Sequence, residues 1–403
     1  MSKFLTKKNI LITIIIFIIL RIFISLFYYN YNDLITINVK WVDMIRNYGI
    51  FNIYQIPDGI YDVQVDYPPL FLIWLGIIQP IVSFTVLEDF RMIFQFLMKS
   101  YGVIFDVATI ILLYKKFSPK AALLWSINLA VIINSSMWGQ IDSSFAFFTI
   151  LMFYYMKEHN TKMTCFIFAL NCLSKLQGVY LLPILLLFLI NEKIELKEKI
   201  KSLGIGISTG ILFFIPFIIA NKDILLPFKI YLGGTSRWAQ FNRGAANFLV
   251  FLSYKDYSGI WNIISPLLVI LFMLLFFLFY KKTKDIYISS TFYLYCLFMC
   301  TLSQQERYGF YTMVLLLITY IIQEKKEYLW YYLAMMISVA SNQIMALHQL
   351  NYKLASIYDN APYIEEINLR NIDFVAYALY IAFFINILIF LELSKKIRKE
   401  KIK

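Results

Sequence analysis

Long apolar segments follow one another along almost the whole chain, with short polar connectors between them. Such segments carry few charged residues, and many approach the roughly 20 residues that a helix needs to cross a bilayer. Because the bilayer offers no water to backbone N–H and C=O groups, these segments form helices that satisfy their own hydrogen bonds. The sequence therefore predicts an all-α polytopic membrane protein of about 12 transmembrane helices. They are expected at approximately residues 9–29, 92–114, 121–136, 142–156, 163–174, 178–190, 202–220, 259–280, 286–302, 309–323, 328–346 and 371–393.

The charge distribution orients these helices. The chain has a net charge of +12 at pH 7, and its lysines and arginines gather in every second connector, for example at Lys115-Lys116 and over 193–201. Short loops rich in Lys and Arg stay in the cytoplasm, so both termini are predicted to be cytoplasmic. The same rule accounts for the basic charge without nucleic-acid binding, which we exclude as a function. Frequent Ile, Lys and Asn is typical of AT-rich bacterial genomes and favours the bacterial cytoplasmic membrane.

One apolar segment, 67–86, does not fit the alternation of sides. If it crossed the membrane, the later basic connectors would face outward, against the positive-inside rule. It begins with Pro68-Pro69 and is interrupted by Gln79-Pro80, so we predict an interfacial or re-entrant helix within an external loop 30–91. The apolar spacing from Val39 onward predicts a second, amphipathic helix in the same loop. A spanning helix remains the alternative for the first segment.

The polar clusters that are able to carry chemistry all fall on the external side of this map. They are Asp33, Asp66-Tyr67-Pro68-Pro69, Trp138-Gly139-Gln140-Ile141-Asp142, Lys175-Leu176-Gln177 and Gln305-Glu306-Arg307-Tyr308. A protein with only a structural role has no need of such one-sided clustering, whereas an active site on the outer face does.

Each acidic position also has a purely structural interpretation. Asp33 suits a solvated turn or a helix N-cap. The corner at Asp66 is stiffened by two prolines, which restrict the backbone and suit an ordinary helix-entry turn. Asp142 precedes an apolar run and suits an N-cap. The sequence leaves these alternatives open.

The basic residues on this face are candidates for holding a phosphate. Lys175 and Gln177 interrupt a long apolar stretch, and an ionisable residue near membrane depth favours a functional role. A snorkelling lysine is the alternative. Arg237 and Arg243 lie in a predicted external loop, and the forked donors of arginine suit phosphate. Glu306-Arg307 fits either a binding site or a local salt bridge.

These residues, in this order, resemble a known family. The series is an Asp soon after the first helix, a Trp, Asp-Tyr-Pro-Pro, Asn134-Ser135-Ser136-Met137-Trp138-Gly139-Gln140-Ile141-Asp142, Lys-x-Gln and Glu-Arg-Tyr. It is similar to the bacterial relatives of the second GPI-anchor mannosyltransferase, which belong to the GT-C class of polyprenyl-phosphate-sugar-dependent glycosyltransferases. The resemblance covers roughly residues 1–310. It departs from the family at Gln305, usually a His, and at Gly244-Ala245-Ala246-Asn247-Phe248-Leu249, where an asparagine motif is degraded.

The resemblance implies a GT-C-like bundle with juxtamembrane helices in the first external loop, built as one membrane domain over residues 1–403. Residues 1–190 would form the catalytic module. Residues 191–403 would form a variable helical module with external loops 221–258, 303–308 and 347–370. The implied activity moves a hexose, mannose by family default, from a polyprenyl-phosphate carrier to an extracytoplasmic glycan, lipid or protein acceptor. The lipid-linked donor, this acceptor and membrane lipids are the expected partners.

The resemblance also assigns roles to residues. Asp33 is the catalytic candidate, and Asp142 with Glu306 forms a second acidic site. A phosphate leaving group needs charge stabilisation more than it needs a general acid. The candidates for binding the donor phosphate are Lys175, Arg237, Arg243 and Arg307. The candidates for binding substrate are Trp41, Asp66, Tyr67, Trp138, Gln140, Gln177 and Tyr308. A divalent cation, Mg²⁺ or Mn²⁺, held by Asp33 and Asp142 stays open.

Two other function classes remain from the sequence. A flippase or exporter of lipid-linked glycans, without transferase activity, would line a path through its helices with polar residues, and Arg21 and Lys99 lie within predicted spans. An oligosaccharide polymerase or ligase would have one large external loop, whereas the longest loop here has about 37 residues.

Overall fold

The computed structural model describes residues 6–28, 30, 33, 37–56, 63–85, 91–237, 239–358 and 364–399, without the side chains of 83–85, 91, 234–237, 349–358, 364–375 and 399. In these ranges nearly all regular structure is helical. The helices of the first half are α1 (Lys7–Phe27), α2 (Val39–Tyr48), η3 (Ile50–Gln55), α3 (Pro69–Thr85), α4 (Arg91–Lys116), α5 (Pro119–Ser126), α6 (Leu129–Ile132), η5 (Ile133–Trp138), α7 (Asp142–Lys157), α8 (Thr161–Ser174), η6 (Leu176–Leu181) and α9 (Leu182–Asn191). The later elements are α10 (Leu196–Asn221), α11 (Leu226–Arg237), β1 (Asn242–Arg243), η7 (Val250–Leu252), α12 (Trp261–Thr283), α13 (Ile286–Cys300), β2 (Gln304–Gln305), α14 (Gly309–Gln323), α15 (Lys326–Tyr358) and α16 (Ile364–Lys399).

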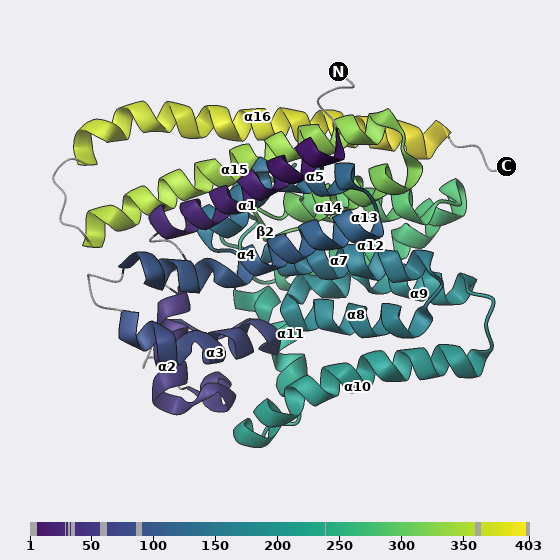
Figure 1. Cartoon of the computed structure of the whole chain (residues 1–403), viewed down its shortest axis with the longest axis horizontal. Helices are drawn as coiled ribbons and strands as arrows, with labels where there is room; N and C mark the ends of the chain where they lie inside the picture. The colour runs from purple at the N-terminus through teal and green to yellow at the C-terminus, as the bar shows by residue number, and fades with distance from the viewer. Residues whose placement is uncertain are drawn as a thin grey trace. The chain divides into compact units, whose positions relative to one another are not determined.

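All twelve predicted spans coincide with helical segments (Figure 1). Within the described ranges, five helices are long and apolar enough to cross a membrane, namely α1, α4, α10, α12 and the Ala376–Arg398 part of α16. A bent pair of helices brings the number to six if it counts as one span. The other apolar helices among the candidates have only 10–17 residues. The long apolar helices indicate a membrane-embedded helical protein, while the number of 12 spans stays a prediction.

The span predicted over 121–136 is broken, which corrects the sequence analysis. Helix α5 ends at Ser126, and the chain bends by 55° before it continues through α6 and η5. Asn128 starts the second piece as its N-cap, because its Oδ1 accepts a hydrogen bond from the backbone N–H of Val131 at 3.1 Å. An N-cap inside an apolar run permits a new helix to begin there.

The predicted amphipathic helix in the first external loop is confirmed as α2. It buries Trp41, Val42, Met44 and Ile45 against α3, while Asp43 and its neighbours on the other face are exposed. Helix α3 begins at the second proline of the Pro-Pro pair and contains Pro80, as the sequence indicated. Whether α3 spans the membrane or lies at its surface stays open.

The chain forms two compact units. The first unit comprises Met1–Val179 and Glu192–Gly234, and the second comprises Tyr180–Asn191 and Thr235–Lys403. In the first, α1 packs on α4 and α5, α4 on α7, α7 on α8, and α8 on α10. In the second, α12 to α16 pack in sequential pairs, and α15 lies beside α16 (Figure 1). The predicted modules 1–190 and 191–403 are functional assignments and stay predictions.

The second unit contains more helix than the sequence indicated. The predicted external loop 347–370 is helical in its described parts, because α15 continues to Tyr358 and α16 begins at Ile364. The pair β1 and β2 forms a short parallel ladder with Asn242 opposite Gln304.

Candidate functional site

Residues 133–142 lie at the centre of the polar network of the first unit. The π-helix η5 ends at Trp138, and its C-cap Gly139 has a left-handed backbone with φ of 81°. The turn packs directly on the backbone of α4, because a Cβ at Gly102 would lie only 2.6 Å from the carbonyl oxygen of Gln140. Glycine at position 102 therefore lets the two segments approach closely.

Asp33 is held by this turn. Its Oδ2 accepts hydrogen bonds from Nε1 of Trp138, at 3.0 Å, and from Nε2 of Gln140. Among the described residues no hydrogen bond reaches Oδ1 of Asp33. Two donors on one oxygen fix the orientation of the carboxylate and leave the other oxygen available as an acceptor. The structure thus unites three of the predicted site residues.

The backbone at Asp33 explains how the side chain reaches the turn. Its φ is +57°, and its carbonyl oxygen accepts hydrogen bonds from the N–H groups of Ile37 and Asn38. Asn30, also buried, donates from Nδ2 to the carbonyl oxygen of Trp138 at 2.7 Å. Asp33 lies in a turn, and its side chain accepts from Trp138 and Gln140, while the N-cap of α2 is Asn38.

Asp142 and Lys175 form a buried ion pair. Nζ of Lys175 donates to Oδ1 of Asp142, and Nδ2 of Asn134 donates to its Oδ2 at 2.9 Å. The two charged side chains are 2% and 0% exposed. Both structural alternatives are therefore wrong: Lys175 does not snorkel to the surface, and Asp142 does not cap α7 with its side chain. The chain turns sharply after Lys175, where a Cβ at Gly178 would lie 2.6 Å from a backbone nitrogen of α8.

This pairing does not fit a divalent cation shared by Asp33 and Asp142. Both carboxylate oxygens of Asp142 accept hydrogen bonds, one of them from an ammonium that already neutralises the charge. Among the described residues no group of three or more His, Cys, Asp or Glu side chains is arranged to hold a metal ion. Hard cations such as Mg²⁺ take oxygen ligands that are open to them.

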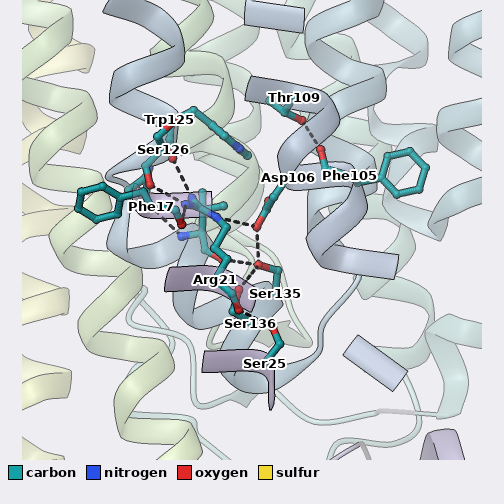
Figure 2. Close-up of polar contacts among 12 residues, drawn as sticks. Phe17, Arg21, Ser25, Phe105, Asp106, Thr109, Trp125, Ser126, Ser135 and Ser136 are labelled. Carbon is teal, nitrogen blue, oxygen red and sulfur yellow. Dashed lines mark hydrogen bonds and ion pairs between the residues drawn. The ribbon is translucent and has the colours of Figure 1, made fainter. Parts of the chain in front are cut away.

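A second buried ion pair joins α1 to α4 (Figure 2). Nε of Arg21 lies 3.4 Å from Oδ2 of Asp106, and the guanidinium also donates to the carbonyl oxygens of Ser126, at 2.7 Å, and Trp125, at 3.1 Å. These two carbonyls lie where α5 ends, so Arg21 satisfies the break in the span. Ser135 of η5 donates to the same Asp106 oxygen, which connects the pair to the turn that holds the catalytic candidate.

One face of α4 supplies most of these partners. Gln95, Lys99, Gly102 and Asp106 recur at helical spacing, and all four are buried. The side chains of Gln95 and Lys99 donate to backbone carbonyl oxygens at the end of α1. From the sequence, only Lys99 of this set stood out as a polar residue within a predicted span. Polar residues or glycine every three to four positions in an otherwise apolar helix were the signal that would have identified Gln95, Gly102 and Asp106.

The corner formed by Asp66-Tyr67-Pro68-Pro69 is held by contacts from two other residues. Oη of Tyr54 donates to the carbonyl oxygen of Tyr67 at 2.6 Å, and the ring of Trp41 packs edge-on against Tyr67 at 5.1 Å. Burial raises the pKa of the Tyr54 phenol well above its usual value, and the negative charge of Asp66 raises it further. Trp41 is 1% exposed, so the structure gives this predicted substrate-binding residue a packing role.

The second unit holds the remaining charged candidates. Arg243 lies opposite Gln305 in the ladder of β1 and β2. Nη1 of Arg307 donates to Oε1 of Glu306 at 2.9 Å, which is the local salt bridge that the sequence left open beside a binding site. The Arg307 guanidinium lies 5.9 Å from the ring centroid of Tyr308. Burial and then the charge of Glu306 raise the pKa of the Tyr254 phenol to about 12, while the charge of Arg243 acts to lower it, so both charges lie near this phenol.

A buried amide network supports these residues and was missed by the sequence analysis. Asn342 of α15 donates to the carbonyl oxygen of Gly244 at 2.8 Å and accepts from the N–H of Ala246 at 2.9 Å. Asn386 of α16 donates to the carbonyl oxygen of Ala246 at 2.7 Å. Asn247, a remnant of the degraded family motif, donates to a carbonyl of α13. Asn342 and Asn386 are isolated polar residues within apolar segments, and this pattern was the signal in the sequence that would have identified them.

The predicted site residues are divided between the two units. Asp33 and its partners, with Asp142 and Lys175, belong to the first unit, whereas Arg243 and residues 306–308 belong to the second. Gln177 is half-buried in η6. Arg237 ends α11, and its side chain lies outside the described residues.

No protein-family model matches the chain, and no curated protein matches it. The fold defines the class of protein as a helical membrane protein. Any more specific function is inferred from the residues and their geometry.

Proposed function

We propose that this protein is a membrane glycosyltransferase of the GT-C type. It moves a hexose, mannose by family default, from a polyprenyl-phosphate carrier to a glycan, lipid or protein acceptor outside the cytoplasmic membrane, with inversion at the sugar. The observation that carries the proposal is the Asp33 carboxylate, which Trp138 and Gln140 hold by one oxygen while the other oxygen has no hydrogen bond among the described residues. Such a carboxylate is suited to accept a proton.

In the proposed reaction Asp33 acts as the general base. Its Oδ1 takes the proton of the acceptor hydroxyl as that oxygen forms a bond to C1 of the sugar. The bond between C1 and the phosphate oxygen breaks, and its electron pair leaves with the polyprenyl phosphate. General base catalysis of this kind contributes roughly 10²–10⁴-fold. A glycosidase would need two carboxylates flanking the bond, whereas this reaction needs one carboxylate and cations for the phosphate.

The leaving phosphate calls for positive charge. Arg243 and Arg307 of the second unit stay candidates on the chemistry of arginine, whose forked donors suit phosphate. Lys175 is a weaker candidate than its sequence suggested, because its ammonium is already paired with Asp142. We assign that ion pair to holding the turn 133–142 in place.

The test is sugar transfer in membranes that contain the wild type, Asp33→Asn or Trp138→Phe, supplied with labelled polyprenyl-phosphate hexoses. Asp33→Asn keeps the shape of the side chain but removes the base, so transfer should be abolished while the protein remains folded. Trp138→Phe removes one hydrogen bond to the carboxylate and should lower transfer by about tenfold. Full activity in Asp33→Asn would refute the assignment of the base.

The flippase alternative loses part of its support. It was based on Arg21 and Lys99 as polar residues that would line a path through the helices. The Arg21 guanidinium instead donates hydrogen bonds to Asp106 and to carbonyl oxygens of α5. Wild-type protein that moves lipid-linked glycan across a bilayer, but transfers no sugar from any polyprenyl-phosphate donor, would favour the flippase.

A further inference from the structure

Lys99 stands apart from the other buried charges. Seven charged side chains are buried in the described part of the chain. Six of them form three ion pairs, Arg21 with Asp106, Lys175 with Asp142, and Arg307 with Glu306. Lys99, which is fully buried, is the seventh, and no described carboxylate pairs with it.

The contacts of Lys99 use only part of its donor capacity. Nζ donates one hydrogen bond, to the carbonyl oxygen of Tyr28 at 2.5 Å, and lies 5.5 Å from the centroid of the Tyr28 ring. An ammonium has three N–H donors and no acceptor. Among the described residues two donors of Lys99 therefore have no hydrogen-bond partner.

Capping the end of α1 does not account for a charge at this position. One turn earlier on α4, the neutral amide of Gln95 performs the same task, because its Nε2 donates to the carbonyl oxygen of Leu26. Burying an ammonium away from water is costly unless an anion compensates for it. An amide at position 99 would cap Tyr28 without this cost, so the charge at Lys99 points to an anion that the described residues do not supply.

Two chains of contacts connect Lys99 to the proposed base. Along the chain, its acceptor Tyr28 precedes Asp33 by five residues. Along α4, Lys99 lies one turn from Gly102, on which the backbone of Gln140 packs, and the Gln140 side chain donates to Asp33. Among the described residues, the buried cation without a carboxylate and the carboxylate with an oxygen that accepts no hydrogen bond thus belong to the same polar network.

We propose that Lys99 binds the phosphate of the lipid-linked donor. This inference rests on the proposed glycosyl transfer and names a phosphate-binding residue for it. When the bond between C1 and the phosphate oxygen breaks, the electron pair stays on that oxygen, and the ammonium of Lys99 stabilises the added negative charge. The proton of the acceptor goes to Asp33, so base and cation act on opposite ends of the reaction.

Binding of polyprenyl phosphate tests the proposal separately from transfer. The purified full-length protein in nanodiscs of neutral lipid is titrated with labelled polyprenyl phosphate and, as the uncharged probe, with the corresponding polyprenol. The wild type should prefer the phosphate. Lys99→Gln keeps a cap for Tyr28 but loses the charge, so its affinity for the phosphate should fall by about tenfold or more while its affinity for polyprenol is unchanged.

Three further variants complete the experiment. Lys99→Arg retains the charge and should retain the preference for phosphate. Lys115→Gln removes an exposed charge from the same helix and should bind as the wild type does. Lys99→Met provides a second variant without charge if Lys99→Gln does not fold, and the same loss is expected.

The outcomes separate the two proposals. A wild type that prefers the phosphate, with a Lys99→Gln variant that keeps the full preference, overturns the role of Lys99 and leaves the proposed function standing. A wild type that binds phosphate and polyprenol equally overturns both. Binding that is lost in Lys99→Gln, together with no sugar transfer by the wild type, supports the phosphate site and overturns glycosyl transfer.

Discussion

The close packing of Gly102 on the turn 133–142 gives the sharpest test of the site geometry. In Gly102→Ala, the new Cβ would lie 2.6 Å from the carbonyl oxygen of Gln140 and 3.1 Å from Cβ of Ser135. Neither neighbour is the flexible end of a long side chain, so the turn itself has to move. To restore an ordinary contact of 3.4 Å, the Gln140 carbonyl has to retreat by about 0.8 Å.

That displacement is large compared with the hydrogen bonds at stake. The bond from Trp138 to Asp33 is 3.0 Å long, and a retreat of the whole turn would lengthen it to as much as about 3.8 Å, which is no longer a hydrogen bond. Overpacking of this kind costs about 1–3 kcal/mol of stability. A misplacement of about 1 Å in a catalytic group costs on the order of 10²-fold in rate. We therefore expect a folded but destabilised protein with about 10²-fold slower transfer.

The assay combines thermal unfolding in detergent with the transfer measurement in membranes. Gly210→Ala is the matched control, because it also adds a methyl group to a helix of the first unit but meets no atom within 4 Å. It should unfold and react as the wild type does. If Gly102→Ala has the unfolding temperature and the rate of this control, α4 does not support the turn at backbone contact and the reasoning is refuted.

Two other predictions concern stability and follow from single contacts. Lys175→Met leaves the Asp142 carboxylate buried without its counter-charge, so it should lower the free energy of unfolding by about 3–5 kcal/mol, and a second change, Asp142→Asn, should recover part of that loss. Urea or thermal unfolding of the wild type, Lys175→Met and the double variant measures these differences. A Lys175→Met variant as stable as the wild type would contradict the ion pair. The second prediction is a loss of stability at alkaline pH from Tyr54, whose pKa in the folded protein is raised above the ordinary value of 10.0 by burial and then by Asp66. Its contribution is fully present below about pH 10 and disappears as the pH rises through the higher folded pKa. The unfolding temperature measured across this range should fall more steeply for the wild type than for Tyr54→Phe, which already lacks the hydrogen bond to Tyr67. Parallel pH profiles would show that the phenol is not buried at the corner.

Local patterns account for the parts of the fold that the sequence predicted. Hydropathy identifies a helix from its own residues, and all twelve predicted segments are helical. The break within 121–136 was missed because an apolar run hides it. Asn128 can start a new helix there, but the freed carbonyls of α5 are satisfied by Arg21, about a hundred residues earlier in the chain. No local window contains that partner.

The sequence predicted which residues belong to the candidate site, but it did not predict which of them contact one another. Asp33, Trp138 and Gln140 were named from motifs, and the structure brings them together. Their contact joins positions 105 and 107 residues apart, which no spacing rule in one sequence can establish. Lys175 illustrates the opposite case, because its residue type suited a phosphate while its place in the fold gives it a carboxylate.

The sequence by itself determined that this protein is helical and membrane-embedded, and it predicted on which side the polar clusters lie. These properties depend on the sum of local transfer and charge effects, which every residue contributes independently of its distant neighbours. Only the tertiary structure decided which of the described buried charges form ion pairs. Pairing depends on which helix faces meet, and by that criterion Lys99 is the buried charge that no carboxylate among the described residues neutralises.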